Sequence, residues 1–292
     1  MSNLIKPDSS LRIMKTTLIA DSGFTKTDWR LIGSDGKIKQ ARTLGINPYY
    51  QTEEEILEVI QDLHGQLPNS VDEIFFYGTG CSSDKNKSKV SNLLAKYYTS
   101  ANIEVNHDLL AAARSLCGKE QGIACILGTG TNSCLYNGQE IVDNVPSLGW
   151  AIADEGGGTY LGKTLMIDYF RKDMPEDLRE AFRLEYPDLD KDTFLTAIYQ
   201  QPMPGRYLST FAKFIGEHIN EPYMYRLVYD AFSIFLNKNV AKYEGYNTLP
   251  VHFTGSVAFY FNNVLRKAAA DQGIYIKHIS EHPIAGLALF HQ

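Results

Sequence analysis

The chain of 292 residues contains no apolar run that approaches the roughly 20 residues a membrane-spanning helix needs. Residues 1–11 are polar and include no apolar stretch, so we do not expect a secretory signal there. We interpret these residues as a leader before the first strand. Both absences favour a cytoplasmic protein that does not enter a membrane.

Cysteine is scarce, and the few cysteines show no metal-binding spacing. None of the four belongs to a C-x-x-C pair, which argues against a zinc or iron–sulfur site and against a disulfide framework. Cys125 and Cys134 fall in predicted strands, where a free cysteine behaves as a small buried apolar residue. The other two are Cys81 and Cys117.

An excess of positive charge is also absent. The net charge is −6 and the pI is about 5.7, which disfavours broad binding to nucleic acid or to an anionic membrane. The Walker A sequence G-x-x-x-x-G-K-[ST] does not occur. Neither absence argues against a local phosphate site built from backbone N–H groups.

The length suggests about two domains, and a hydrophobic fraction of 44% allows a sizeable core. Three strands are expected within 15–42, then helix, strand, helix, strand and helix up to 117, and a more helical second half that restarts at 122. This order predicts an α/β fold with a mixed sheet covered by helices. We expect an N-terminal domain over 15–118 and a C-terminal domain with helical insertions over 119–282. Whether the last helix, within 283–292, packs back on the first domain is left open.

Caps and apolar spacing predict the individual elements. Thr52 and Glu55 form a capping-box pattern ahead of a helix that reaches Leu63. Further helices are expected over 87–98, 109–117, 176–184, 190–199, 208–220, 221–243, 257–270 and 284–290. Strands are expected over 73–77, 103–105, 123–127, 134–136, 249–253 and 274–279.

Two strand–loop–strand units look like copies of one device. In the first, an apolar strand over 17–19 enters the small polar turn 20–27; in the second, a strand over 123–127 enters the turn 128–133. Glycine lets a ligand approach backbone N–H groups closely, and the Ser and Thr hydroxyls add donors. Two such tips facing each other would hold an anion from both sides, and a nucleotide polyphosphate is the obvious candidate.

These segments resemble those of a known superfamily. Residues 21–28 are similar to the first phosphate loop of the sugar kinase–Hsp70–actin superfamily, 128–133 to its second phosphate loop, and 254–257 to its adenosine loop. The segment 149–156, Gly-Trp-Ala-Ile-Ala-Asp-Glu-Gly, resembles one in N-acetylglucosamine kinases and the related BadF/BadG-type ATPases. The resemblance spans about 15–290 and implies two ribonuclease H-like domains, the actin-like ATPase fold, around a central cleft. The first loop of the family has two adjacent glycines, and here Phe24 stands in the second position.

Phosphoryl transfer needs charge neutralisation on the phosphates, an in-line acceptor and a way to remove the acceptor proton. The resemblance implies that Asp21 holds Mg²⁺ through water, and that Gly23, Thr25 and Lys26 face the phosphates of ATP. Taken alone, Asp21 could equally be a turn residue that bonds its own loop, and Lys26 a solvated surface lysine.

The short strand over 103–105 ends at residues 106–108. We expect Asp108, at this strand end, to be the general base that takes the proton of the sugar hydroxyl. The competing interpretation is that Asp108 is the N-cap of the helix over 109–117. The neighbouring His107 is expected to be structural.

The second loop and the adenosine loop supply the other nucleotide contacts. Backbone N–H groups and hydroxyls of Gly128, Thr129, Gly130 and Thr131 suit the charge that develops on the γ-phosphate, although a tight turn would need the same residues. By resemblance the pair at 255–256, Gly255 and Ser256, lies beside the adenine and the ribose. A strand-to-helix turn capped by Ser256 is compatible with that role.

The sugar-side candidates come from three segments. By resemblance Asn47, Asp154 and Glu155 bond the hydroxyls of a hexosamine, and unmatched buried polar groups would make such a site specific. Gly78 and Thr79 could add donors from the turn after the strand over 73–77. Asp154 could instead cap the helix that follows it.

The resemblance implies an ATP- and Mg²⁺-dependent sugar kinase whose substrate is an amino sugar. N-acetylglucosamine is the first candidate, followed by N-acetylmuramic acid and glucosamine, with transfer to the 6-hydroxyl, and a homodimer is compatible with the family. Two alternatives stay open: an ATPase that activates a partner enzyme through a shared iron–sulfur cluster, and a sugar sensor or actin-like assembly protein without turnover.

Overall fold

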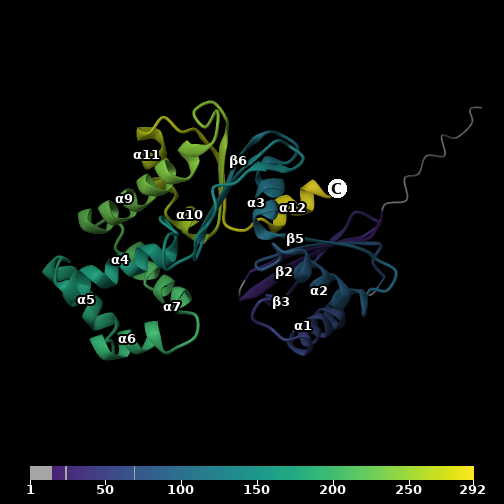
Figure 1. Cartoon of the computed structure of the whole chain (residues 1–292), viewed down its shortest axis with the longest axis horizontal. Helices are drawn as coiled ribbons and strands as arrows, with labels where there is room; N and C mark the ends of the chain where they lie inside the picture. The colour runs from purple at the N-terminus through teal and green to yellow at the C-terminus, as the bar shows by residue number, and fades with distance from the viewer. Residues whose placement is uncertain (1–14, 24, 69) are drawn as a thin grey trace, which may run out of the picture. The chain divides into compact units, whose positions relative to one another are not determined.

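The computed structural model describes residues 15–23, 25–68 and 70–292. The expected leader and Phe24 therefore lie outside the described residues. The chain forms two compact units: the first contains the described residues up to Asp108 together with His291 and Gln292, and the second contains Leu109–Phe290 (Figure 1). The domain limits 15–118 and 119–282 stay a prediction, and the contacts place the helix after Asp108 in the second unit.

The first unit is built on a five-stranded sheet of order β3-β2-β1-β4-β5. Strands β1, β4 and β5 are parallel, and β2 is antiparallel to both β1 and β3. The register places Ser22 beside Gly78 and Gly78 beside His107, so the three parallel strands end at one edge. The strands are β1 (Thr17–Ser22), β2 (Lys26–Ile32), β3 (Ile38–Leu44), β4 (Glu73–Gly78) and β5 (Asn102–His107).

Helices α1 (Glu53–Gln66) and α2 (Asp84–Ala95) complete the first unit. The capping box is confirmed: the Thr52 hydroxyl accepts from Glu55 N at 3.2 Å, and the Glu55 carboxylate accepts from Thr52 N at 2.8 Å. Helix α2 begins three residues before the expected start, because Ser83 caps it by accepting from Asn86 N. The apolar faces of both helices pack on the sheet in one core.

The second unit repeats the same strand order, β8-β7-β6-β9-β10. Strands β6, β9 and β10 are parallel, and β7 is antiparallel to both β6 and β8. The strands are β6 (Gly122–Leu127), β7 (Thr131–Tyr136), β8 (Ile141–Asp143), β9 (Val251–Thr254) and β10 (Ile276–Ser280). This duplication confirms the expected α/β fold of two ribonuclease H-like units.

Most helices of the chain belong to the second unit, and Figure 1 shows α5 to α7 as a group that follows α4. The expected helix over 208–220 is divided at the buried Phe211, and the one over 257–270 is divided at the buried Phe261. The expected helix over 221–243 ends at Lys238, and a single 3₁₀ turn follows it. Each division lets the chain turn so that the ring enters the core. The helices are α3 (Asp108–Cys117), α4 (Gly158–Arg171), α5 (Glu176–Glu185), α6 (Lys191–Tyr199), α7 (Pro204–Thr210), α8 (Ala212–Glu217), α9 (Pro222–Lys238), η1 (Val240–Lys242), α10 (Ser256–Tyr260), α11 (Asn262–Asp271) and α12 (Ile284–Phe290).

The last helix, α12, packs on α3. The Ser115 hydroxyl donates to Pro283 O at 2.8 Å, and the Arg114 guanidinium lies 5.3 Å from the centre of the Phe290 ring. The two residues after α12 belong to the first unit, where the His291 ring stacks on Phe75 with centroids 3.8 Å apart. Packing of 283–292 on a domain that covers 15–118 stays a prediction. None of the described helices is both long and apolar enough to cross a membrane.

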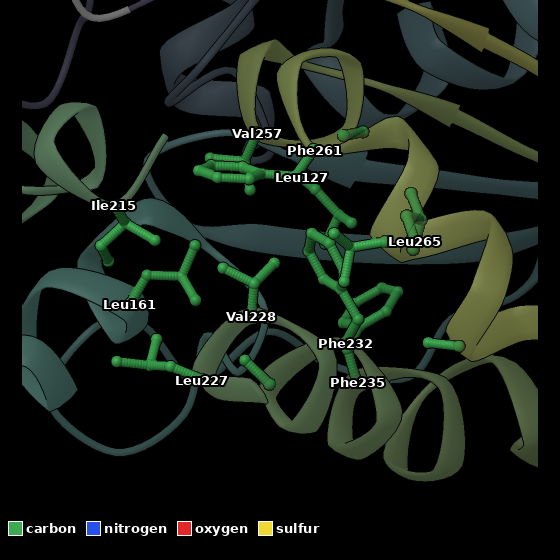
Figure 2. Packing of buried hydrophobic residues seen from close by; sticks show 14 of the residues in the cluster. Leu127, Leu161, Ile215, Leu227, Val228, Phe232, Phe235, Val257, Phe261 and Leu265 are labelled. Atoms are coloured by element: carbon green, nitrogen blue, oxygen red, sulfur yellow. The ribbon is translucent and has the colours of Figure 1, made fainter. Parts of the chain in front are cut away.

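The core of the second unit fixes the loops that follow β6 and β9 (Figure 2). Leu127, the last residue of β6, and Val257, in the first turn of α10, are both buried in it. Side chains from α4 and α9 pack around them, including Leu161, Phe232 and Phe235. Because such a core is closely packed, the residues directly after Leu127 and directly before Val257 have defined positions.

A buried histidine on β9, His252, should make the protein sensitive to acid. Its side chain is 3% exposed, and burial lowers its pKa from 6.5 to about 4, with a further contribution from Lys277 and His278 and an opposing one from Glu120. Between pH 4 and 6.5 the unfolded chain therefore binds a proton that the folded chain does not. The free energy of unfolding should fall as the pH drops through this interval.

We expect His252 to cost the wild-type protein about 2 kcal/mol of stability between pH 7 and pH 5. His252→Leu should escape this loss, because leucine does not titrate and removes a ring Nδ1 that is buried without a hydrogen-bond partner among the described residues. Urea unfolding of both proteins at both pH values measures the difference. An equal loss in the two proteins would show that acid acts elsewhere.

Candidate active site

The edge where β1, β4 and β5 end brings together three residues that the sequence predicted for catalysis or binding. Asp21 is the penultimate residue of β1, Thr79 follows β4 and Asp108 follows β5. The Thr79 hydroxyl donates to Asp108 Oδ2 at 3.0 Å, and Thr79 N donates to Ser22 O at 3.0 Å. The turn after β4 therefore orients the Asp108 carboxylate.

Negative charge gathers around Asp21. Burial raises the pKa of its carboxyl to about 7, Asp108 and Asp28 add to the rise, and Lys26 opposes it. A carboxyl in this environment gains from a bound divalent cation. The described residues contain no group of three or more metal-binding side chains, so water and phosphate oxygens would complete the coordination, as Mg²⁺ prefers. The surroundings of Asp21 fit a Mg²⁺ ion on these terms.

Asp28 is a site neighbour that sequence reasoning missed. It lies opposite Asp21 in the β1–β2 register, and it accepts from Arg42 Nε at 2.8 Å and pairs with Lys26 Nζ at 3.2 Å. Burial alone would raise the pKa of Asp28, but the bonds from Arg42 and Lys26 lower it overall. The Lys26 ammonium thus lies near both carboxylates. The period-2 alternation of β2 places Asp28 on the same face as Lys26 and Arg30, so the sequence pattern does not indicate that Asp28 is buried.

Across the first loop, Gly23 N donates to Lys26 O at 3.0 Å. Thr25 is exposed, and its carbonyl accepts from Gly45 N at 3.1 Å. The loop and the segment that leads to Asn47 are therefore joined by the backbone.

Asn47 lies beside the turn after β4. Both are predicted to bind the sugar, and segments that bind one ligand must be neighbours. Its side chain is 4% exposed, and Oδ1 accepts from Tyr49 N at 3.1 Å. A β-carbon on Gly80 would lie only 2.6 Å from the same Oδ1, which places the turn over 78–80 against the amide. Gly78, Thr79 and Asn47 thus belong to one edge of the first unit.

The second phosphate loop, residues 128–131, is held by the start of α4. Gly158 N donates to Gly128 O at 2.8 Å, and Thr159 N donates to Thr129 O at 2.9 Å. These bonds explain why a helix can begin in a run of glycines: the first N–H groups of α4 are satisfied by the loop.

Gly255, at the end of β9, has φ 114° and approaches β6 so closely that a β-carbon would lie 2.3 Å from Leu127 O.

A cavity of about 760 Å³ opens from this loop within the second unit. The sequence predicted Gly128, Thr129 and Ser256 among its lining residues, but not the wall formed by Ser209, Lys213 and Gly216 of α7 and α8. A β-carbon on Gly158 would lie 3.2 Å from Ser209 Cβ, whereas one on Gly216 would lie 3.6 Å from the Phe261 ring. Glycines and side-chain hydroxyls therefore line one end of the cavity, and aromatic rings line the other end.

Asp154 and Glu155 point to different partners. Asp154 Oδ1 accepts from Thr131 N at 3.2 Å, and burial raises the pKa of this carboxyl. Glu155 accepts from Lys238 of α9 at 2.6 Å; burial alone would raise its pKa, but this bond lowers it overall. Asp154 thus contacts the second phosphate loop, and Glu155 contacts α9. Their roles toward a sugar stay predictions.

All four cysteines are free and buried. Burial raises the pKa of the Cys81 and Cys117 thiols to about 12, and it also raises those of Cys125 and Cys134. Cluster ligation requires an accessible thiolate, so these environments argue against the iron–sulfur activator.

The chain is similar to several proteins of known structure. A protein from Porphyromonas gingivalis, named "Putative N-acetylglucosamine Kinase", shares 40% identity with it over 94% of this chain and 98% of that chain, with a TM-score of 0.89. A protein from Chromobacterium violaceum with the same name has 16% identity and a TM-score of 0.74, over 96% of this chain and 99% of that one.

A ROK hexokinase from Thermus thermophilus has 14% identity and a TM-score of 0.51, over 95% of this chain and 97% of that one. Like the Chromobacterium protein, at this identity it shows a shared fold alone. No protein-family model and no curated protein matches the chain.

Proposed function

The chain belongs to the N-acetylglucosamine kinase family of the sugar kinase–Hsp70–actin superfamily and is a sugar kinase, and we propose that it phosphorylates an amino sugar with ATP. The observation that carries the proposal is the 40% identity to the Porphyromonas protein over nearly the whole chain. N-acetylglucosamine is the first substrate, ahead of N-acetylmuramic acid and glucosamine, and its 6-hydroxyl is the acceptor.

The cavity of the second unit supports the nucleotide part of the proposal. Its volume of about 760 Å³ suits a ligand of nucleotide size. The phosphates would lie at the end formed by Gly128, Thr129 and the start of α4, where backbone N–H groups and hydroxyls suit an anion. The adenosine would lie toward Gly255, Ser256 and the rings of Tyr260 and Phe261. Gly130 and Thr131 would complete the second loop.

Asp21 would hold Mg²⁺ at the end of β1, and that ion would supply charge neutralisation on the phosphates when bound. Gly23, Thr25 and Lys26 would face the phosphates from the first loop. The ion pair between Lys26 and Asp28 would keep the ammonium near Asp21.

Asp108 would act as the general base. Its Oδ2 already accepts from Thr79, which leaves Oδ1 to take the proton of the sugar hydroxyl during in-line transfer. Asn47, Gly78, Thr79, Asp154 and Glu155 would bind the other polar groups of the sugar. A sugar that lacks one of these groups would leave a buried partner unpaired, which is the source of the expected specificity.

A coupled assay of ADP release across a panel of amino sugars tests this proposal. We expect turnover with N-acetylglucosamine, a sugar phosphate of matching mass, and slower turnover with glucosamine, which lacks the acetyl group. ADP release without any sugar phosphate would contradict it and favour the ATPase that activates a partner. Sugar binding without ADP release would favour the sensor. A homodimer and a cytoplasmic location stay predictions.

A further inference from the structure

Residues 144–154 form a segment between β8 and the turn that begins α4, and this segment contains no helix or strand. It ends at Asp154, which the proposed function places beside the sugar. Leu148 and Ile152 are exposed, and none of residues 144–153, all of which the structure describes, is buried. Burial in the core therefore does not explain how the segment keeps its position.

Side-chain hydrogen bonds fasten both ends of the segment to β7. At its start, Asn144 Nδ2 donates to Ser133 O at 2.6 Å. At its end, Asp154 Oδ1 accepts from Thr131 N at 3.2 Å. The paired residues of β7 and β8 end at Asp143, so bonds from side chains replace the backbone ladder along the rest of β7.

Tyr243 adds a third attachment from a distant part of the chain. It follows η1, its side chain is 1% exposed, and it packs in the core of the second unit. Its hydroxyl accepts from Val145 N at 2.9 Å and shares a hydrogen bond with the Ser133 hydroxyl at 2.7 Å. One phenol thus joins the start of the segment to β7 and anchors both to the core.

Burial alone does not require these bonds. Tyr98 in the first unit is 2% exposed, and its hydroxyl is buried without a hydrogen-bond partner among the described residues. A tyrosine hydroxyl can therefore be buried in this protein without being paired. What Tyr243 provides beyond a phenylalanine is its hold on Val145 and Ser133.

We propose that Tyr243, together with Asn144, positions the sugar-binding turn by fixing the course of the segment that leads to Asp154 and Glu155. The inference rests on the proposed function, because that function assigns the two acidic residues to the sugar. With the hydrogen bonds in place, the turn is ordered before the sugar arrives. Without the phenol hydroxyl, the sugar would have to order the segment as it binds, and its affinity would fall.

Initial rates over a range of N-acetylglucosamine concentrations test this role in Tyr243→Phe, which keeps the ring and removes the hydroxyl. We expect KM for the sugar to rise about tenfold and kcat to change less than about threefold, because the lost order weakens the ground state and the transition state alike. ADP affinity should change less than about twofold, because neither Tyr243 nor the segment lines the cavity. Lower stability alone would instead reduce kcat at an unchanged KM, since part of the enzyme would be unfolded.

Tyr98→Phe is the matched control. It removes a hydroxyl that is buried to the same degree but bonds none of the described residues, so KM should equal that of the wild type. Asn144→Ala provides a second variant at an exposed position, where folding is not at risk. It removes the bond to Ser133 O, so KM should rise about threefold or more.

Hydrogen exchange followed by mass spectrometry gives a readout that does not depend on turnover. Amides within 145–153 should exchange about tenfold faster in Tyr243→Phe than in the wild type, because fewer bonds oppose local opening. Saturating N-acetylglucosamine should restore their protection, since the bound sugar orders the turn.

A wild-type KM in Tyr243→Phe, or in Asn144→Ala if the first variant does not fold, would overturn the inference and leave the kinase proposal intact. A fall in kcat at an unchanged KM would overturn it too, because the phenol would then act on stability alone. Equal exchange within 145–153 in Tyr243→Phe and the wild type would show that the hydroxyl does not hold the segment. A wild-type protein that neither binds the sugar nor forms sugar phosphate would overturn the proposed function together with this inference.

Discussion

Asp108→Asn should slow sugar phosphorylation by about 10²- to 10⁴-fold, the usual contribution of a positioned general base. The amide cannot take the proton of the sugar hydroxyl. It can still accept from the Thr79 hydroxyl, which bonds Oδ2 at 3.0 Å, so the geometry of the edge should survive. ADP affinity should change less than about twofold, because the cavity lies in the second unit and Asp108 does not line it.

The same variant separates catalysis from helix capping. Asparagine is about as good an N-cap as aspartate, so a residue that only caps α3 would tolerate the change in both stability and rate. Initial rates over a range of sugar concentrations, with thermal unfolding as a check on folding, measure both effects. Asp84→Asn, on the exposed first turn of α2, is the control and should be silent. Near-normal turnover in Asp108→Asn would place the base elsewhere.

Gly128→Val should weaken ADP binding at least tenfold, equivalent to about 1.4 kcal/mol, without unfolding the protein. A β-carbon at this position meets no atom within 4 Å, and Gly128 lines the cavity. The added side chain would therefore occupy the space expected for the phosphates and would keep them from the backbone N–H groups.

Gly65→Val is the matched control for that variant. Gly65 lies in α1 of the first unit, and a β-carbon there also meets no atom within 4 Å. The same substitution should leave ADP affinity unchanged. Calorimetric titration of both variants gives the comparison, and normal affinity in Gly128→Val would remove the loop 128–131 from the nucleotide site.

The duplicated sheet could be predicted because its evidence is local. Each copy is an apolar strand, a turn of small residues and a returning strand. The turns at Gly23 and Gly128 lie where the apolar strand residues give way to small and polar ones. The edge position of Asp108 followed from the short strand before it. Such features depend on neighbours in sequence, so one sequence is enough to indicate them.

The cavity wall could not be predicted in the same way. Ser209, Lys213 and Gly216 belong to α7 and α8, and their helical pattern gives no sign that they face the loop after β6. The division of that helix at Phe211 depends on where a ring finds space in the core, which is a tertiary effect. Asp28 likewise becomes a neighbour of Asp21 only through the register of two paired strands.

All four thiols are protected by burial, so their chemical modification reports when the structure around each of them opens. Cys81 belongs to the first unit, and Cys117, Cys125 and Cys134 belong to the second. An alkylating reagent reacts with the thiolate, so these side chains should be modified only when the surrounding structure opens. Mass spectrometry of partly alkylated protein would then tell which half of the molecule opens first, without any label being introduced.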